Sequence, residues 1–212
     1  SEEFAQPIGN GASVHRGDMR EIQAKNEYDV VLTDPPYYDN IMYSELSDYF
    51  YVWQKILLED EYDGFDQVKT PRAESIVTNP HLGKTEDDFE DEMRQALETI
   101  NTALKQDGTL AFTYHHSDEE SWGELLESLC NNDFEVTATY PINSDLNKFI
   151  GGEAVSFDIV IVARPTEERT PTSWRRLRID IMNRLKEIQK SLEENRDLTE
   201  GDIGVVEMGA CF

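Results

Sequence analysis

The sequence has little cysteine and no long apolar run, and each shortage excludes a class of protein. Cys130 and Cys211 lie far apart, with no CxxC or Cys/His ligand spacing around them, so we expect neither a disulfide framework nor a metal site. No apolar run approaches the length of a membrane span, and the N-terminus lacks the basic and then apolar pattern of a signal peptide. We therefore expect a cytoplasmic protein without a membrane anchor.

Positive charge is the third shortage. Lys and Arg number 19 against 44 Asp and Glu, giving a formal net charge of −25, and this charge disfavours polyanionic partners through repulsion. Hydrophobic residues at 38% and aromatic residues at 10% are still too abundant for a disordered acidic chain. The acids are spread over separate predicted elements, which indicates a halophilic protein adapted to high salt. An acidic partner-binding surface is the alternative.

The spacing of apolar residues predicts alternating strands and helices. Helices are predicted at residues 43–58, 86–107, 119–131 and 173–194, and strands at 12–16, 28–33, 109–114, 135–140 and 157–163. The last strand follows its predecessor without an intervening helix, so we expect it to pair antiparallel. Residues 59–84 show no apolar period and predict a long irregular excursion. This order predicts an α/β fold on an open three-layer sheet, mostly parallel with one antiparallel strand.

The apolar run at residues 28–33 ends at Asp34-Pro35-Pro36-Tyr37, and these four residues suit chemistry on an amine. An exocyclic amine of a nucleobase is a poor nucleophile because its lone pair is delocalised into the ring. The Asp34 carboxylate and the Pro35 carbonyl could each accept one N–H and draw the nitrogen toward tetrahedral geometry. The two prolines restrict the loop, and Tyr37 offers an aromatic face for a base removed from its stack.

This motif resembles the Asp/Asn-Pro-Pro-Tyr/Phe motif of the DPPY amino-methyltransferases. The longer run DPPYYDNIMYSELSDYFYVW, residues 34–53, together with FTYHH, residues 112–116, resembles the adenine-specific DNA methylases of archaea and bacteria over roughly residues 17–165. The resemblance implies a Rossmann-like methyltransferase domain at residues 1–165, followed by a C-terminal helix and tail at 166–212. It also implies S-adenosyl-L-methionine as cofactor, DNA as partner and adenine N6 as methyl acceptor. A strand-terminal turn in an unrelated α/β protein is the alternative.

The resemblance also implies where the cofactor binds. Asp18 stands in the place of the carboxylate that binds the adenosine part in the family, and Asp34 is expected to border the same cofactor. An ordinary turn or helix cap is an equal alternative for Asp18. The family's glycine-rich turn is missing, so we expect the cofactor half to be incomplete and supplied by a further segment or subunit. Residues 204–212, GVVEMGACF, superficially resemble a first strand and turn and offer a permuted alternative.

Candidate nucleic-acid contacts come from two places. Lys69, Arg72 and Lys84 form a positive island in the irregular segment, suited to phosphate contact. Tyr114 and His115 close a strand at the edge where ligands of open α/β sheets gather, and could face the target base. The alternatives are a solvated loop for the cations and ordinary packing for the aromatic pair.

Two other functions stay open from the sequence. Methylation of RNA or of a protein amide would use the same pair of acceptors, because both substrates present a planar amine or amide. A truncated, non-catalytic methyltransferase-like binding module is the third reading, and the missing glycine-rich turn is its best support.

Overall fold

The computed structural model describes residues 11, 12, 15, 17–35, 42–114, 119–150, 153–167, 169–193 and 200–211. Its elements are the 3₁₀ turn η1 (Met19–Glu21), β1 (Tyr28–Thr33), α1 (Tyr43–Leu58), η2 (Asp63–Phe65), η3 (Pro80–Leu82), α2 (Glu86–Ala103), β2 (Leu104–Tyr114), α3 (Glu119–Asn131), β3 (Phe134–Ile150), β4 (Glu153–Pro165), α4 (Trp174–Glu193) and α5 (Glu200–Cys211). Within these ranges no helix has both the length and the hydropathy needed to cross a bilayer.

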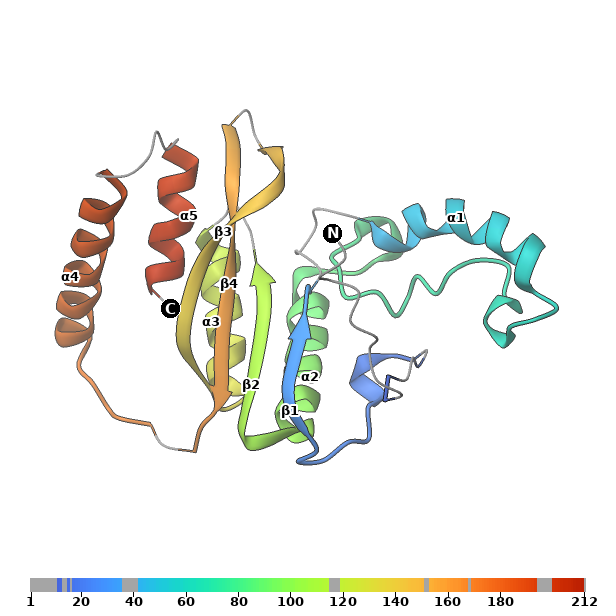
Figure 1. The fold of residues 1–212 in the computed structure, drawn as a ribbon, viewed down its shortest axis with the longest axis horizontal. Helices are drawn as coiled ribbons and strands as arrows, with labels where there is room; N and C mark the ends of the chain where they lie inside the picture. The colour runs from blue at the N-terminus through green and yellow to red at the C-terminus, as the bar shows by residue number, and fades with distance from the viewer. Residues whose placement is uncertain are drawn as a thin grey trace.

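Four strands form one sheet in the order β1-β2-β4-β3 (Figure 1). β1 pairs parallel with β2, and β4 pairs antiparallel with both β2 and β3. Three strands therefore point one way and β4 the other, which confirms the prediction of a mostly parallel sheet with one antiparallel strand. The β3–β4 pair has the direct connection that antiparallel neighbours allow, whereas β1 to β2 and β2 to β3 use helical crossovers.

The core lies on one face of the sheet. Leu110, Phe112 and Tyr114 alternate along β2 with relative exposures of 3% or less, and their partners on β4, Ile159 and Ile161, are equally buried. The buried side of α2 and the α3 side chains pack against this row as one cluster: Phe89, Met93, Leu97, Ile100, Trp122, Leu125 and Leu129. Burial of this apolar area is the main stabilising term of the fold.

The opposite face of the sheet has less cover. Val30 and Leu32 of β1 are 61% and 78% exposed. In the described part of the chain α2, α3 and α5 all contact the buried cluster on the other face. The reason is the course of the chain after β1: α1 extends away from the sheet instead of returning across it (Figure 1).

Element boundaries agree closely with the sequence predictions in most places. Helices 43–58 and 119–131 and strand 28–33 have the predicted bounds. The helix predicted to run to residue 107 ends at Ala103, and β2 begins at Leu104. Gly108 sits in a tight approach inside β2, where a Cβ would lie 2.8 Å from the Lys105 carbonyl oxygen. Ala12 and His15 lie in no strand, and the other residues of predicted strand 12–16 are outside the described residues.

The chain end corrects two predictions. Residues 204–212 resembled a strand and turn, and a tail was expected after residue 194, but residues 200–211 form helix α5. Two valines beside glycines give this segment a strand-like composition. Its tertiary environment makes it helical instead. Gly209 lets α5 approach β4 closely, because a Cβ there would lie 3.2 Å from Ile159 Cγ2. Thr139 of β3 also donates its hydroxyl to the Gly209 carbonyl at 2.8 Å.

Candidate functional site

Asp34 and Pro35 follow β1 directly, at the edge of the sheet where the parallel strands end. Thr113, near the end of the neighbouring β2, donates its hydroxyl to Asp34 Oδ1. The register of the two strands explains this contact, because Thr33 lies opposite Phe112 and the following residues continue side by side. The hydrogen bond holds an otherwise exposed carboxylate in one orientation.

The phenol of Tyr43 lies within electrostatic range of this carboxylate. Tyr43, the first residue of α1, is 38% exposed, and burial together with the negative charge of Asp34 raises its pKa. At neutral pH the phenol is therefore protonated and is available as a hydrogen-bond donor. Asp34, Thr113 and Tyr43 thus bring a carboxylate and two hydroxyl groups to one edge of the sheet.

Asp18 comes directly before η1 and is held by Arg20, the second residue of that turn. Its carboxylate accepts the Arg20 backbone N–H at 2.8 Å, Arg20 Nε at 3.0 Å and Arg20 Nη2 at 2.5 Å. The guanidinium hydrogen bond lowers the pKa of Asp18, so the carboxylate is ionised at neutral pH. Asp18 is therefore also the N-cap of η1, which is the alternative that the sequence left open.

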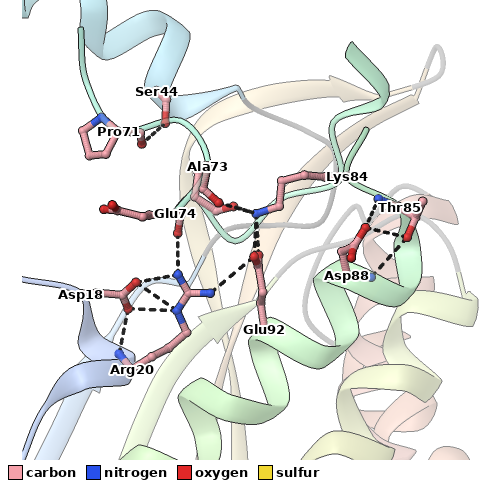
Figure 2. A network of polar contacts seen from close by, with 11 residues as sticks. Asp18, Arg20, Ser44, Pro71, Ala73, Glu74, Lys84, Thr85, Asp88 and Glu92 are labelled. Atoms are coloured by element: carbon pink, nitrogen blue, oxygen red, sulfur yellow. Dashed lines mark hydrogen bonds and ion pairs between the residues drawn. The ribbon is translucent and has the colours of Figure 1, made fainter. Parts of the chain in front are cut away.

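A network of ion pairs ties Asp18 to the rest of the fold (Figure 2). Arg20 Nη1 lies 3.4 Å from Glu92 Oε1 of α2, and Arg20 Nη2 donates to the Glu74 carbonyl at 3.0 Å. Glu92 also accepts from Lys84 Nζ at 2.7 Å and 2.8 Å. The four charged side chains are 11–17% exposed, so the network fixes η1 and the irregular segment against α2.

A cavity of about 1030 Å³ adjoins this network. Gly17, Asp18 and Met19 line one side, and Ser44, at the start of α1, lines another. Ser44 lines the cavity and its neighbour Tyr43 responds to the charge of Asp34, so the beginning of α1 is associated with both sites. Of the two carboxylates that the sequence singled out, Asp18 lines the cavity and Asp34 does not.

The other predicted residues belong to the motif after β1 and to the end of β2, and within the described residues none of them is placed in the site. Pro36, Tyr37 and His115 lie outside the described residues. Tyr114 is 2% exposed, packs edge to face on Trp122 with 4.9 Å between ring centroids, and donates its hydroxyl to the Ser121 carbonyl at 3.4 Å. Its side chain therefore belongs to the core, which is the packing alternative stated for it.

The three predicted phosphate contacts also differ from one another. Arg72 forms ion pairs with Asp48 and Glu45, and Lys84 is 11% exposed in its pair with Glu92. These carboxylates neutralise the two cations locally, which weakens their attraction for phosphate. Lys69 is exposed.

Sequence reasoning missed Thr113, Tyr43 and Arg20. A hydroxyl one residue before the β2 end was a usable signal, because parallel neighbours end together. The start of α1 carried no such signal, since its position depends on how the irregular segment folds. Arg20 was detectable as a cation two residues from a candidate cofactor carboxylate.

Comparison with known proteins gives limited similarity. No protein family model matches the chain, and no curated protein matches it. Among solved structures, the chain is similar to a TehB-like S-adenosylmethionine-dependent methyltransferase from Corynebacterium glutamicum, with 17% identity, a TM-score of 0.32 and 71% of this chain covered. It is also similar to a candidate DNA modification methylase from Thermus thermophilus, with 15% identity, a TM-score of 0.41 and 81% covered. The chain spans 54% and 64% of the lengths of these two structures.

Proposed function

We propose that this chain carries the catalytic half of an S-adenosylmethionine-dependent methyltransferase acting on an exocyclic amine of a nucleobase, most simply adenine N6 in DNA. One observation carries the proposal: Asp34 and Pro35 stand at the carboxyl end of a parallel strand, with the Asp34 carboxylate oriented by Thr113. An oriented carboxylate beside a backbone carbonyl is what an amine needs to present its lone pair.

In the proposed reaction the main task of the protein is to position the amine. Asp34 accepts one N–H of the amine and the Pro35 carbonyl accepts the other, so that the nitrogen lone pair turns toward the incoming methyl group. The cofactor would supply an electrophilic methyl group when bound, and the methylated amine would then lose one N–H proton to solvent. Tyr43 is protonated at neutral pH, because burial and the negative charge of Asp34 raise the pKa of its phenol.

Asp18 suits the adenosine part of the cofactor. Asp18 lines the cavity with an ionised carboxylate, and Arg20 makes four contacts with its two oxygens, so a cofactor amine or hydroxyl would share these oxygens with Arg20. Among the described residues we find no glycine-rich turn that could approach the methionine end. The residues present therefore fit one end of the cofactor.

We propose that a further segment or subunit supplies that other end. β1 pairs with β2 along one edge, and no strand of the described ranges pairs along the other. Val30 and Leu32 expose apolar side chains beside this free edge. Edge strands with exposed apolar residues are templates for further pairing, which supports completion of the sheet here.

Calorimetric titration of S-adenosylmethionine and S-adenosylhomocysteine at molar salt tests the cofactor assignment. We expect saturable binding that Asp18→Ala weakens at least about tenfold, the effect of one charge-assisted hydrogen bond. Asp60→Ala, an exposed acid outside the network, is the matched control and should bind like the unchanged protein. Equal binding by Asp18→Ala would remove Asp18 from the cofactor site, and no binding by any variant would place the cofactor site outside this chain.

A further inference from the structure

Helix α1 is amphipathic, but its polar side faces the protein. Thr70 donates its backbone N–H and its hydroxyl to Asp48 Oδ1 at 2.8 Å and 2.7 Å. Lys55 Nζ and the Tyr51 hydroxyl both donate to the Gln67 carbonyl at 2.8 Å. These contacts seat the inner side of α1 on residues 65–72 and fix which side of the helix faces solvent.

The outer side of α1 is apolar and exposed. Six large side chains, here called the outer face, have relative exposures of 60–78%: Leu46, Tyr49, Phe50, Trp53, Ile56 and Leu57. Their spacing at i, i+3, i+4 and i+7 places them on one stripe of the helix. In Figure 1 α1 reaches away from the sheet, and the stripe has no cover from the described elements.

The exposed side of α1 is uncharged, although the chain as a whole is highly acidic. Acids number 44 in 212 residues, yet none of the ten exposed residues of α1 is charged: Tyr43, Leu46, Ser47, Tyr49, Phe50, Val52, Trp53, Gln54, Ile56 and Leu57. Its two acids, Glu45 and Asp48, lie on the inner side with Arg72. An uncharged apolar stripe on a highly acidic protein is typical of an interface.

The area of the outer face is enough for a stable dimer. A whole aromatic side chain offers roughly 150–250 Å², so six large side chains exposed by 60–78% present on the order of 900 Å². A standard interface buries about 800 Å² per partner. One face of this size, meeting a copy of itself across a two-fold axis, satisfies that requirement.

Charge selects the partner and the orientation. A nucleic acid needs cations, and the exposed residues of α1 include none. Glu59, Asp60 and Glu61 follow α1 directly, so a parallel pair would bring two acidic clusters together. An antiparallel pair separates them by about 24 Å, the length of sixteen helical residues, and sets each cluster beside the other copy's helix N-terminus, where negative charge is favourable.

We propose that the outer face of α1 is a dimerisation surface, occupied by the antiparallel α1 of a second copy of this chain. Self-association is independent of the proposed catalytic function, because Asp34 and Asp18 take no part in it. At molar salt, where the repulsion between two highly acidic chains is screened, the dimer is the stable form.

Sedimentation equilibrium of the full chain at molar potassium chloride tests the proposal. Trp53→Glu should raise the dimer dissociation constant at least about thirtyfold, the effect of losing a buried aromatic anchor. Trp174→Glu is the matched control, because Trp174 is also exposed, at 71%, but lies on α4; it should leave the dimer unchanged. Circular dichroism should show both variants folded. A monomer at all concentrations, or a dimer that Trp53→Glu leaves intact, would overturn the proposal.

Two further measurements address orientation and a competing occupant. In a background without the two native cysteines, Cys130→Ser with Cys211→Ser, chains with Leu46→Cys should form a disulfide with chains carrying Leu57→Cys and not among themselves; the reverse would contradict antiparallel pairing. Flotation with phosphatidylglycerol vesicles checks a lipid surface. Vesicle binding by a monomeric chain, abolished by Trp53→Glu, would assign the outer face to lipid and exclude the dimer.

Discussion

Asp34 and Thr113 come from neighbouring strands, and the orientation of the carboxylate depends on the hydroxyl. In the proposed reaction Thr113 is a positioning residue, since it acts through Asp34. Without this hydrogen bond the Asp34 carboxylate would populate several rotamers. A smaller fraction of the bound amine would then have a reactive geometry.

We predict that Thr113→Val lowers kcat for methyl transfer about tenfold while KM and the thermal midpoint stay nearly unchanged, as for loss of a supporting hydrogen bond. Thr113→Ser keeps the hydroxyl and should recover most of kcat. Steady-state kinetics on the two variants provide the check. Equal kcat in Thr113→Val, or no recovery by serine, would show that the hydrogen bond has no positioning effect.

The residues of the candidate site differ in whether a local sequence pattern is enough to find them. The place of Asp34 and Pro35 at the end of a strand could be predicted because an apolar run followed by Asp-Pro-Pro is a local pattern. Thr113 depends on strand register, and Tyr43 on the seating of α1, and neither is a local property. Arg72 and Lys84 looked available as cations because their partners Asp48 and Glu92 lie 24 and 8 residues away in the sequence.

At the scale of elements, α2 begins with a capping box. Thr85 accepts the Asp88 backbone N–H at 3.3 Å, and Asp88 accepts the Thr85 backbone N–H at 2.7 Å. Thr85→Ala should lower the free energy of unfolding by about 1 kcal/mol, whereas Thr85→Ser should preserve it. Urea unfolding measures both. A stability loss in serine equal to that in alanine would show that the hydroxyl is not the stabilising group.

The seating of α1 depends on pH through Asp48. Hydrogen bonds from Arg72 and then Thr70 lower the pKa of Asp48 from 3.8 to about 2. Because the folded pKa is depressed, the stabilisation is present above about pH 4 and is lost as pH falls through about 2.

We predict that Asp48→Asn destabilises the chain at pH 7 and that its difference from the unchanged protein disappears near pH 2. Denaturation of both proteins across this pH range gives the difference directly. Asp60→Asn, an exposed acid beyond α1, should show no comparable trend. A difference that is constant with pH would mean that the Asp48 charge does not secure α1.

Helix and strand positions were predictable where burial follows local period, as in α2 with Phe89, Met93 and Leu97. The same period in α1 misleads about direction, because an apolar stripe normally faces a core and here faces solvent. α5 was missed for the opposite reason: its short apolar run carries a strand-like composition, and its helical form follows from packing on β4.

At the scale of the whole molecule, the net charge of −25 opposes compactness at low salt. Raising potassium chloride from about 0.1 M to about 2 M shortens the Debye length from about 10 Å to a few Å. We expect the thermal midpoint to rise by at least about 5 °C, at about 2–4 °C per kcal/mol for a chain of this size. Sucrose at matched osmolality separates screening from solute exclusion. A midpoint that does not respond to salt would argue against adaptation to high salt.

The proposed function is tested by transfer of a labelled methyl group from S-adenosylmethionine to DNA by the intact chain at molar salt, with methylated adenine identified by mass spectrometry. We expect N6-methyladenine with the unchanged chain. Asp34→Ala should lower the activity about 10²–10³-fold, comparable to removing one preorganised polar group, and Asp34→Asn should keep substantial activity, because its amide oxygen still accepts a hydrogen bond. Equal activity in Asp34→Ala, or cofactor binding without any methylated nucleobase, would contradict the proposed function.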